Sequence, residues 1–376
     1  TTDMSTLSPS TRLYRALDAV AADNETKTLQ PGHTHGAYTS PDVLDQERDR
    51  IFRRSWVCVG HIADVVMSGD YAVEAILGSE VLIAHGDDGE IRTFHNVCRH
   101  RGHLVVEERG NTRRLTCPYH AWSYSLDGSL FHAPHTAGVD GLDPEQLGLR
   151  AIRTDIVAGA IFVNLDDDAP TFDECHPGLR AEIEMWAPQP EGLTNVFESP
   201  AVHHANWKAS VENFSECYHC GPVHRYLADN VIDPASYQVS ADALVQRHVV
   251  ASREGDMTQR LWHIWPNTAM GLYPIPDVGL VWCVRHMYPR STSETTYHYR
   301  WYATVDQDAD AVRAYAEHHA STTSAEDAAI VEGAQRGMSA DPTATNILVC
   351  NPARGVGSEH VIRYFHDLVR TALKTA

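Results

Sequence analysis

Two cysteine–histidine pairs constrain the fold of this chain more than any other feature. One residue separates Cys98 from His100, two residues separate Cys117 from His120, and sixteen residues lie between the pairs. Both pairs lie close to short runs such as EVLIAH and AWSYSL, which are typical of strands. The sequence therefore predicts a small β domain in which two loops bring four side chains to one metal centre.

The four donors suit two kinds of metal centre. A [2Fe–2S] cluster can take two thiolates on one iron and two neutral imidazoles on the other, and the imidazoles raise its reduction potential. A zinc ion also accepts two thiolates and two imidazoles. Zinc fingers usually pair Cys with Cys and His with His, whereas each loop here contributes one of each. Gly102 and Pro118 also suit tight turns around a cluster. We favour the iron–sulfur cluster, with structural zinc as the alternative.

A second group of potential ligands lies in NWKASVENFSECYHCGPVHR, which contains His219 and His224. On an unbroken helix, two residues five positions apart would point about 140° away from each other. Gly221-Pro222 is expected to end the helix after about Cys220, which lets His224 turn back toward His219. Both imidazoles can then share one ion.

A site with two histidines and one carboxylate leaves coordination positions free, which suits Fe(II) that binds O₂ beside a substrate. We expect Asp327 to supply the carboxylate, from a helix that Ser324 can cap. A carboxylate directed into a core is costly unless a cation compensates it. Glu326 and Glu332 fall on other faces and are expected to be solvated. The face of Asp327 also carries apolar residues, namely Ile330, Val331, Ala334 and Met338.

Other interpretations of these residues stay open. Asp341 is a weaker candidate for the third ligand, because it precedes a proline in a predicted loop. Asp327 would also be favourable near a helix N-terminus without any metal. Cys217 and Cys220 form a C-x-x-C pair, which can be redox-active or bind zinc with the adjacent histidines.

The order of the motifs predicts two domains in a chain of 376 residues. Residues 1–45 are expected to form an arm, irregular to about residue 38, and a helix that begins at Pro41. Short β-type runs fill residues 46–165, and residues 166–376 alternate helical segments with strands. The predicted fold class is α+β.

Composition argues against several classes of function. The formal charge of −20, from 30 basic and 50 acidic side chains, repels nucleic acids and anionic lipids. No apolar run reaches the roughly 18 residues of a membrane span, and no secretory signal is visible, so a cytoplasmic location is expected. The eight cysteines are too few and too irregularly spaced for a disulfide scaffold. Because no nucleotide-binding motif is present, electrons for a redox reaction must come from a partner protein.

Both motifs resemble those of a known enzyme family. CRHRGH followed by CPYHAWSYSLDG resembles the Rieske motif of aromatic-ring and related non-haem iron oxygenases, and NFSECYHCGPVH resembles their mononuclear-iron motif. The resemblance implies that Glu216 links His219 to a Rieske histidine, here His120, of a neighbouring subunit. Most ring-hydroxylating members carry Asp at the position of Glu216. ECYHC and the D-x-x-I-V-E-x-x-Q-R-G pattern starting at Asp327 are more similar to the branch that oxidises quaternary ammonium compounds such as glycine betaine, stachydrine and carnitine.

For the whole chain, the resemblance implies the terminal oxygenase of a multicomponent system. An antiparallel β Rieske [2Fe–2S] domain would precede a helix-grip catalytic domain with mononuclear Fe(II), in a homotrimer. Electrons would come from NAD(P)H through a separate flavin and iron–sulfur reductase, directly or through a ferredoxin.

The expected reaction is O₂-dependent N-demethylation of a small betaine-type substrate, with release of formaldehyde. The alternatives are hydroxylation of an aromatic or other neutral ring, or an electron carrier without oxygenase activity. A cationic substrate favours an aromatic wall. Four aromatic residues are candidates for such a wall: Trp262, Trp265, Tyr273 and Trp282.

Overall fold

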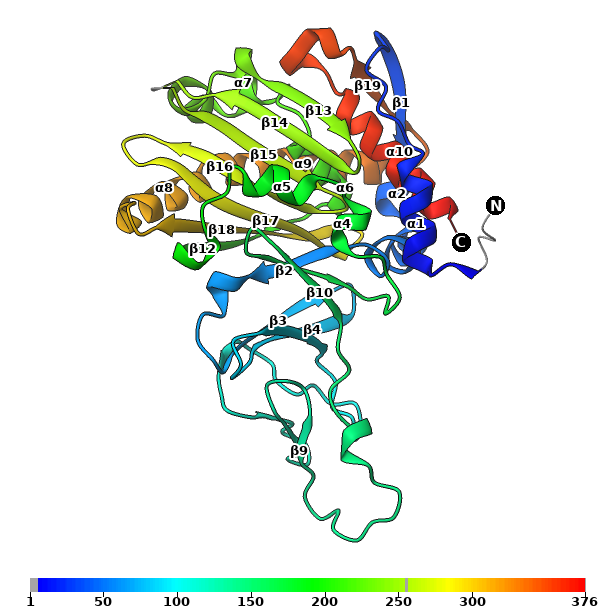
Figure 1. Cartoon of the computed structure of the whole chain (residues 1–376). Helices are drawn as coiled ribbons and strands as arrows, with labels where there is room; N and C mark the ends of the chain where they lie inside the picture. The colour runs from blue at the N-terminus through cyan, green and yellow to red at the C-terminus, as the bar shows by residue number, and fades with distance from the viewer. Residues whose placement is uncertain (1–5, 254–255, 376) are drawn as a thin grey trace.

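A computed structural model describes residues 6–253 and 256–375. The chain folds into a small all-β part, at the bottom of Figure 1, and a larger part in which helices pack on a long sheet. The predicted α+β class is confirmed. Within the described ranges, no helix is long and apolar enough to cross a membrane.

The small part contains three antiparallel sheets. Their strand orders are β10-β11-β2, β5-β4-β3-β6 and β7-β8-β9. Each Cys–His pair lies in a loop next to these strands, the first pair after β5 and the second between β7 and β8. The strands are β2 (Val57–His61), β3 (Asp70–Ile76), β4 (Ser79–His85), β5 (Ile91–His95), β6 (Gly110–Asn111), β7 (Leu115–Thr116), β8 (Ser123–Tyr124), β9 (Leu130–His132), β10 (Arg153–Val157) and β11 (Ala160–Asn164).

The larger part is built on a seven-stranded antiparallel sheet with the order β12-β18-β17-β16-β15-β14-β13. Except at β12, its neighbours in space are neighbours in sequence, so the sheet is largely a meander. Helices α6, α8 and α9 pack against β12, β17 and β18. The strands are β12 (Leu193–His203), β13 (Gln238–Asp242), β14 (Val245–Ala251), β15 (Thr258–Ile264), β16 (Thr268–Ile275), β17 (Gly279–Ser291) and β18 (Glu294–Thr304). The helices of this part are α4 (Phe172–Cys175), α5 (Leu179–Glu184), α6 (Trp207–Phe214), α7 (Cys220–Val223), α8 (Ala309–Ser321), α9 (Thr323–Ala340) and α10 (His360–Lys374).

The N-terminal segment belongs to the compact fold, contrary to the prediction of an irregular arm up to residue 38. Helix α1 (Pro9–Asp18) packs on α10, and β1 (Thr28–Thr34) pairs with β19 (Thr345–Cys350). Figure 1 shows these first and last elements side by side. The reason is an apolar stripe in an otherwise polar segment, because the buried side chains of α1 include Leu13, Tyr14 and Leu17.

A buried ion pair attaches α6 to the helix that begins at Pro41. That helix, α3 (Pro41–Glu47), has Ser40 at its N-cap position and follows the short helix α2 (Gly36–Thr39). The Nζ atom of Lys208 lies 2.5 Å from Oε1 of Glu47, and both side chains are fully buried. A charge pair so far from water holds its geometry tightly, because separating it would leave an uncompensated charge. Helix α6 is thereby fixed where it leads into the second ligand segment.

Candidate metal centres and active site

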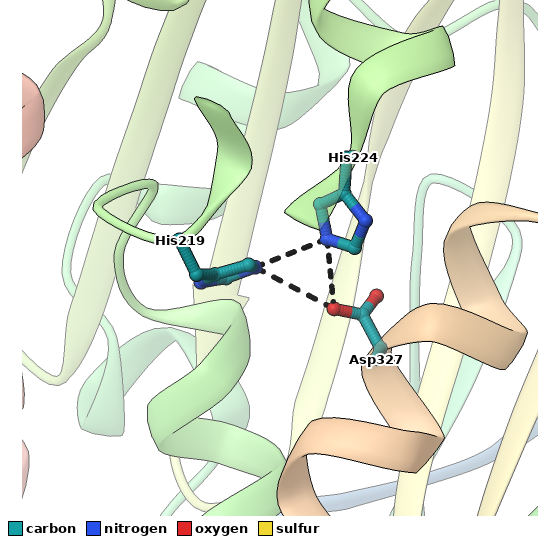
Figure 2. A group of neighbouring side chains, drawn as sticks. All are labelled: His219, His224 and Asp327. Carbon is teal, nitrogen blue, oxygen red and sulfur yellow. Dashed lines mark hydrogen bonds and ion pairs between the residues drawn. The ribbon is translucent and has the colours of Figure 1, made fainter. Parts of the chain in front are cut away.

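His219, His224 and Asp327 form a compact group of potential ligands. Their ligand atoms all lie within 4.8 Å of one another. The two Nε2 atoms are 3.1 Å apart, and Oδ1 of Asp327 lies 3.0 Å from Nε2 of His224 and 3.5 Å from Nε2 of His219. Figure 2 shows the three side chains pointing toward one another from three different segments. This is the donor set and the shared focus that a two-histidine, one-carboxylate iron site requires.

The two histidines converge for a different reason than the sequence predicted. Helix α6 ends at Phe214, not at Cys220, and Gly221-Pro222 lies inside the short helix α7 rather than ending a long one. Proline is tolerated there because the first turn of a helix does not use its backbone N–H groups. His219 immediately precedes this single turn and His224 immediately follows it.

Asp327 lies in the first part of α9, which begins at Thr323, so Ser324 is inside the helix and is not its cap. The predicted direction of the side chain holds, because Asp327 is only 14% exposed and faces the histidines. Asp341 does not take part, since it is exposed and its carboxylate accepts hydrogen bonds from Thr343. Cys217 and Cys220 are joined by a disulfide, so these sulfurs do not act as zinc donors.

Two further carboxylates hold the outer nitrogens of the two imidazoles. Oε1 of Glu216 lies 2.5 Å from Nδ1 of His219, and Oε2 of Glu326 lies 2.8 Å from Nδ1 of His224. Such contacts fix the ring orientation and leave Nε2 to bind a metal. Glu326 and Glu332 were predicted to be solvated, and the side chain of Glu326 is 38% exposed, but the prediction missed its contact with His224. Glu332 also has a partner, the backbone N–H of His204.

The charges of this group are strongly coupled. Burial alone would lower the pKa of His219, but Asp327 and Glu216 outweigh it and raise this pKa to about 10. Burial likewise opposes ionisation of Asp327, yet its hydrogen bonds to both histidines hold the pKa of this carboxyl below its usual value. A divalent cation would replace the protons on the two Nε2 atoms, so metal binding here is linked to proton release.

In the first motif, the two histidines lie close together and the two cysteines lie close together. Cys98 and Cys117 are buried and unpaired by disulfides, whereas His100 and His120 are exposed with ring centroids 4.6 Å apart. The sequence did not indicate Tyr124, whose hydroxyl lies 3.2 Å from Sγ of Cys98. Buried thiols on one side and solvent-facing imidazoles on the other fit a cluster with Cys on the inner iron and His on the outer one.

The backbone of these loops supports that arrangement. The N–H of Cys98 donates to the carbonyl of His103, and the N–H of Cys117 donates to the carbonyl of Trp122. Gly102 has a φ of 75°, so the predicted tight turn requires the left-handed region that glycine adopts without strain.

The sequence matches two family patterns in the same order. The Rieske [2Fe-2S] domain matches residues 55–143, and the ring hydroxylating alpha subunit (catalytic domain) matches residues 191–250 and 230–375. The carnitine monooxygenase oxygenase subunit of Escherichia coli (strain K12) is 30% identical over 384 residues, which cover 99% of this chain and 100% of that protein. This chain belongs to the Rieske oxygenase family. It is the oxygenase subunit of a Rieske non-haem iron monooxygenase, and the family implies both a [2Fe–2S] cluster and a mononuclear iron.

This Rieske oxygenase is also similar to two other proteins. The glycine betaine monooxygenase oxygenase subunit of Chromohalobacter salexigens is 36% identical over 197 residues, or 52% of this chain and 44% of that protein. The crystal structure of a quaternary ammonium Rieske monooxygenase in complex with L-carnitine superposes with a TM-score of 0.81 at 29% identity and covers 91% of this chain and 96% of that one.

A pocket of the oxygenase opens beside the His219, His224 and Asp327 group. Of the four aromatic residues that the sequence offered for its wall, only Tyr273 lines it. Trp262 and Trp265 are buried elsewhere, where their indole N–H groups donate to Glu182 and Ser55. Trp282 is also buried away from the pocket. The sequence missed three aromatic lining residues, Phe214, Tyr237 and Tyr297.

Proposed function

We propose that this oxygenase oxidises a quaternary ammonium compound at a carbon bound to nitrogen. The observation that carries the proposal is the end-to-end similarity to a carnitine monooxygenase oxygenase subunit, together with an aromatic pocket beside the histidine–carboxylate group. Aromatic faces attract quaternary ammonium ions. Tyr297 and Phe214 line the same pocket as His219 and Asp327, so an N-methyl group bound against these rings would lie close to the ligand group.

We assign the roles of the metal-site residues as follows. Cys98, His100, Cys117 and His120 hold the [2Fe–2S] cluster, and His219, His224 and Asp327 hold the mononuclear iron. When bound, the iron supplies O₂ activation. The chain's own contribution is to orient the imidazoles through Glu216 and Glu326 and to place the substrate in the pocket.

The proposed reaction balances with two electrons. One atom of O₂ enters an N-methyl C–H bond, and the other leaves as water with two protons and two electrons. The resulting carbinolamine breaks its C–N bond to give formaldehyde, one proton and the tertiary amine. The electrons come from NAD(P)H through a separate reductase in the cytoplasm, directly or through a ferredoxin.

A head-to-tail trimer would supply the short electron route that one chain lacks. Figure 1 shows β9, near the cluster loops, and α7, between the two iron histidines, at opposite ends of the molecule. His120 is exposed, and so is the neighbouring Tyr119 at 50%. In the trimer, His120 of one copy would face Glu216 of the next, and Glu216 already contacts His219. Glu216 would then act as the bridge between the two centres.

Product analysis tests the proposed function. The holoenzyme, reduced chemically and exposed to O₂, is incubated with glycine betaine, carnitine, choline and benzoate, and formaldehyde and amines are measured. We expect release of an amine, with formaldehyde if a methyl carbon was oxidised, from at least one quaternary compound. A hydroxylated ring product, with no amine from any quaternary compound, would replace this function with ring hydroxylation.

A further inference from the structure

Arg285 is a buried cation in the wall of the active-site pocket. It lies on β17, where Ala269 of β16 and Tyr299 of β18 are its neighbours across the sheet. Its side chain is 5% exposed, and it lines the same pocket as His219 and Asp327. This position could not be predicted from sequence, because the strand pattern does not say which face of the sheet meets the helices.

The surroundings of this guanidinium are aromatic and uncharged. Its central carbon lies 4.6 Å from the ring centroid of Tyr273, 4.8 Å from that of Tyr299 and 5.4 Å from that of Phe214. Among the described residues, no carboxylate lies within ion-pair distance of Arg285. Its Nη2 atom is buried, and among the described residues it has no hydrogen-bond partner.

Arg300, on the neighbouring strand, shows what a structural buried arginine looks like in this protein. It is 4% exposed, and its guanidinium lies within 3.5 Å of Asp64, Glu74 and Glu198. Its Nη1 atom is buried without a hydrogen-bond partner among the described residues, as Nη2 of Arg285 is, so the two arginines differ in their carboxylate neighbours. The fold therefore supplies three carboxylates to one buried arginine and none to the other. Burial of an unpaired charge is unfavourable, and rings offset it only in part.

The other ionisable groups of the pocket do not neutralise Arg285. Asp327 is engaged by both histidines, and Glu216 by His219. Among the described residues, the hydrogen-bond partners of His248 are the neutral Tyr237 and Gln246. Burial lowers its pKa to about 3, so it carries no charge near neutral pH. A carboxylate brought by a ligand would provide the missing partner, since the guanidinium fork matches its two oxygens.

We propose that Arg285 binds the carboxylate of the substrate and so selects betaine-type zwitterions over quaternary cations that lack an acid group. This inference takes from the proposed function only that the substrate carries a quaternary ammonium group. A simple cation such as choline would place its charge beside an uncompensated guanidinium, whereas a betaine neutralises it. The residue is thus a specificity determinant that contacts the substrate.

Equilibrium binding to the holoenzyme tests the proposal without turnover. Titration calorimetry without reductant compares glycine betaine and carnitine with choline and with glycine betaine methyl ester, and includes benzoate as a carboxylate without a quaternary nitrogen. We expect the wild type to bind at least one carboxylate compound about 10- to 100-fold more tightly than the choline and ester probes, which is the range for a charge-assisted hydrogen-bonded pair.

Three variants separate charge, geometry and folding. Arg285→Gln should lose the preference for the carboxylate, and Arg285→Lys should keep part of it. Arg260→Gln is the matched control, because Arg260 lies on β15 against Trp186 and does not line the pocket. Iron content and the visible spectrum of the cluster show that each variant is folded and loaded. If Arg285→Gln does not fold, the comparison of Arg285→Lys with the wild type carries the test.

The outcomes distinguish this proposal from the proposed function. If the wild type binds neither glycine betaine nor carnitine more tightly than choline, or if the preference is unchanged in Arg285→Gln and in Arg285→Lys, the role of Arg285 is overturned and quaternary ammonium oxidation is left intact. Binding of benzoate but of no quaternary compound, with a loss in Arg285→Gln, would support the carboxylate site and contradict the quaternary ammonium function.

Discussion

Oε2 of Glu326 lies 2.8 Å from Nδ1 of His224, while Nε2 of the same ring faces Asp327 at 3.0 Å. Adjacent residues of α9 thus contact both nitrogens of one imidazole. Asp327 occupies the metal-facing side and Glu326 the outer side. A carboxylate on the outer nitrogen fixes the tautomer and raises the basicity of the inner one. Helix α9 therefore positions a histidine that lies about a hundred residues earlier in the chain.

Replacing Glu326 with Gln should weaken binding of the mononuclear iron by about 10- to 100-fold, the usual effect of losing such an outer partner. Competition with a chelator, followed by iron analysis, measures the affinity. Glu332→Gln is the matched control on the same helix, because Glu332 contacts the backbone of His204 and not the ligand group. Equal iron affinity in both variants and the wild type would show that Glu326 does not support the site.

Asp327→Ala should remove about one iron per chain and leave the visible spectrum of the cluster unchanged. The reason is that, among the described residues, Asp327 is the only acidic side chain grouped with both histidines as a potential ligand. Asp341→Ala should keep all of its iron, since that carboxylate is exposed and bonded to Thr343. Loss of iron from the Asp341 variant instead would transfer the ligand role to that residue.

The ligand loops were predictable because the ligands of each motif lie close together in the sequence. The spacing of Cys98, His100, Cys117 and His120 is sufficient to identify the first group, and no long-range contact is needed to read it. His219 and His224 were also predicted to converge, although through the wrong helix end. The mistake arose because α6 stops at Phe214, and Pro222 is acceptable in the first turn of a new helix.

The features that sequence reasoning missed depend on tertiary placement. Glu326 is about 100° around the helix from Asp327, so periodicity assigns it to another face. It reaches His224 because the fold brings the residue that follows α7 to the first turns of α9. Arg285 belongs to a strand buried on both faces, where alternation carries no signal. The strand β1 pairs with a partner more than 300 residues away, which no local pattern reveals.

Glu216→Gln, reconstituted with Fe(II) until both metal centres are loaded, should slow electron transfer between them. An amide retains the size of the side chain but loses the charge that holds Nδ1 of His219. Rapid-mixing measurement of cluster oxidation in a single turnover reports the rate, and we expect a decrease of at least about tenfold, equivalent to about 1.4 kcal/mol of barrier. The same rate in the variant and the wild type would rule out the bridging role.

The protein should lose stability as the pH falls below about 6.5, and His263 should contribute to this loss. Burial lowers the pKa of His263 to about 3, so the folded state keeps it neutral while the unfolded chain takes up a proton near pH 6.5. The unfolded state therefore binds more protons between these values, and the free energy of unfolding decreases on acidification. At pH 5.5 one such histidine costs about 1.4 kcal/mol.

His263→Leu should therefore reduce the fall in Tm between pH 7 and pH 5.5, because it removes a titrating group from the core. The exposed His318 provides the control, and His318→Gln should show the wild-type pH dependence. A wild-type slope in the His263 variant would mean that this residue is not held neutral in the folded protein.

The metal content of the purified protein tests the two-centre assignment most directly. A cluster of two irons and two sulfides plus one mononuclear iron predicts about three irons and two acid-labile sulfides per chain. Two irons and two sulfides, with no third iron taken up on reconstitution with Fe(II), would contradict a mononuclear site at His219, His224 and Asp327. Zinc in place of iron and sulfide would contradict both centres.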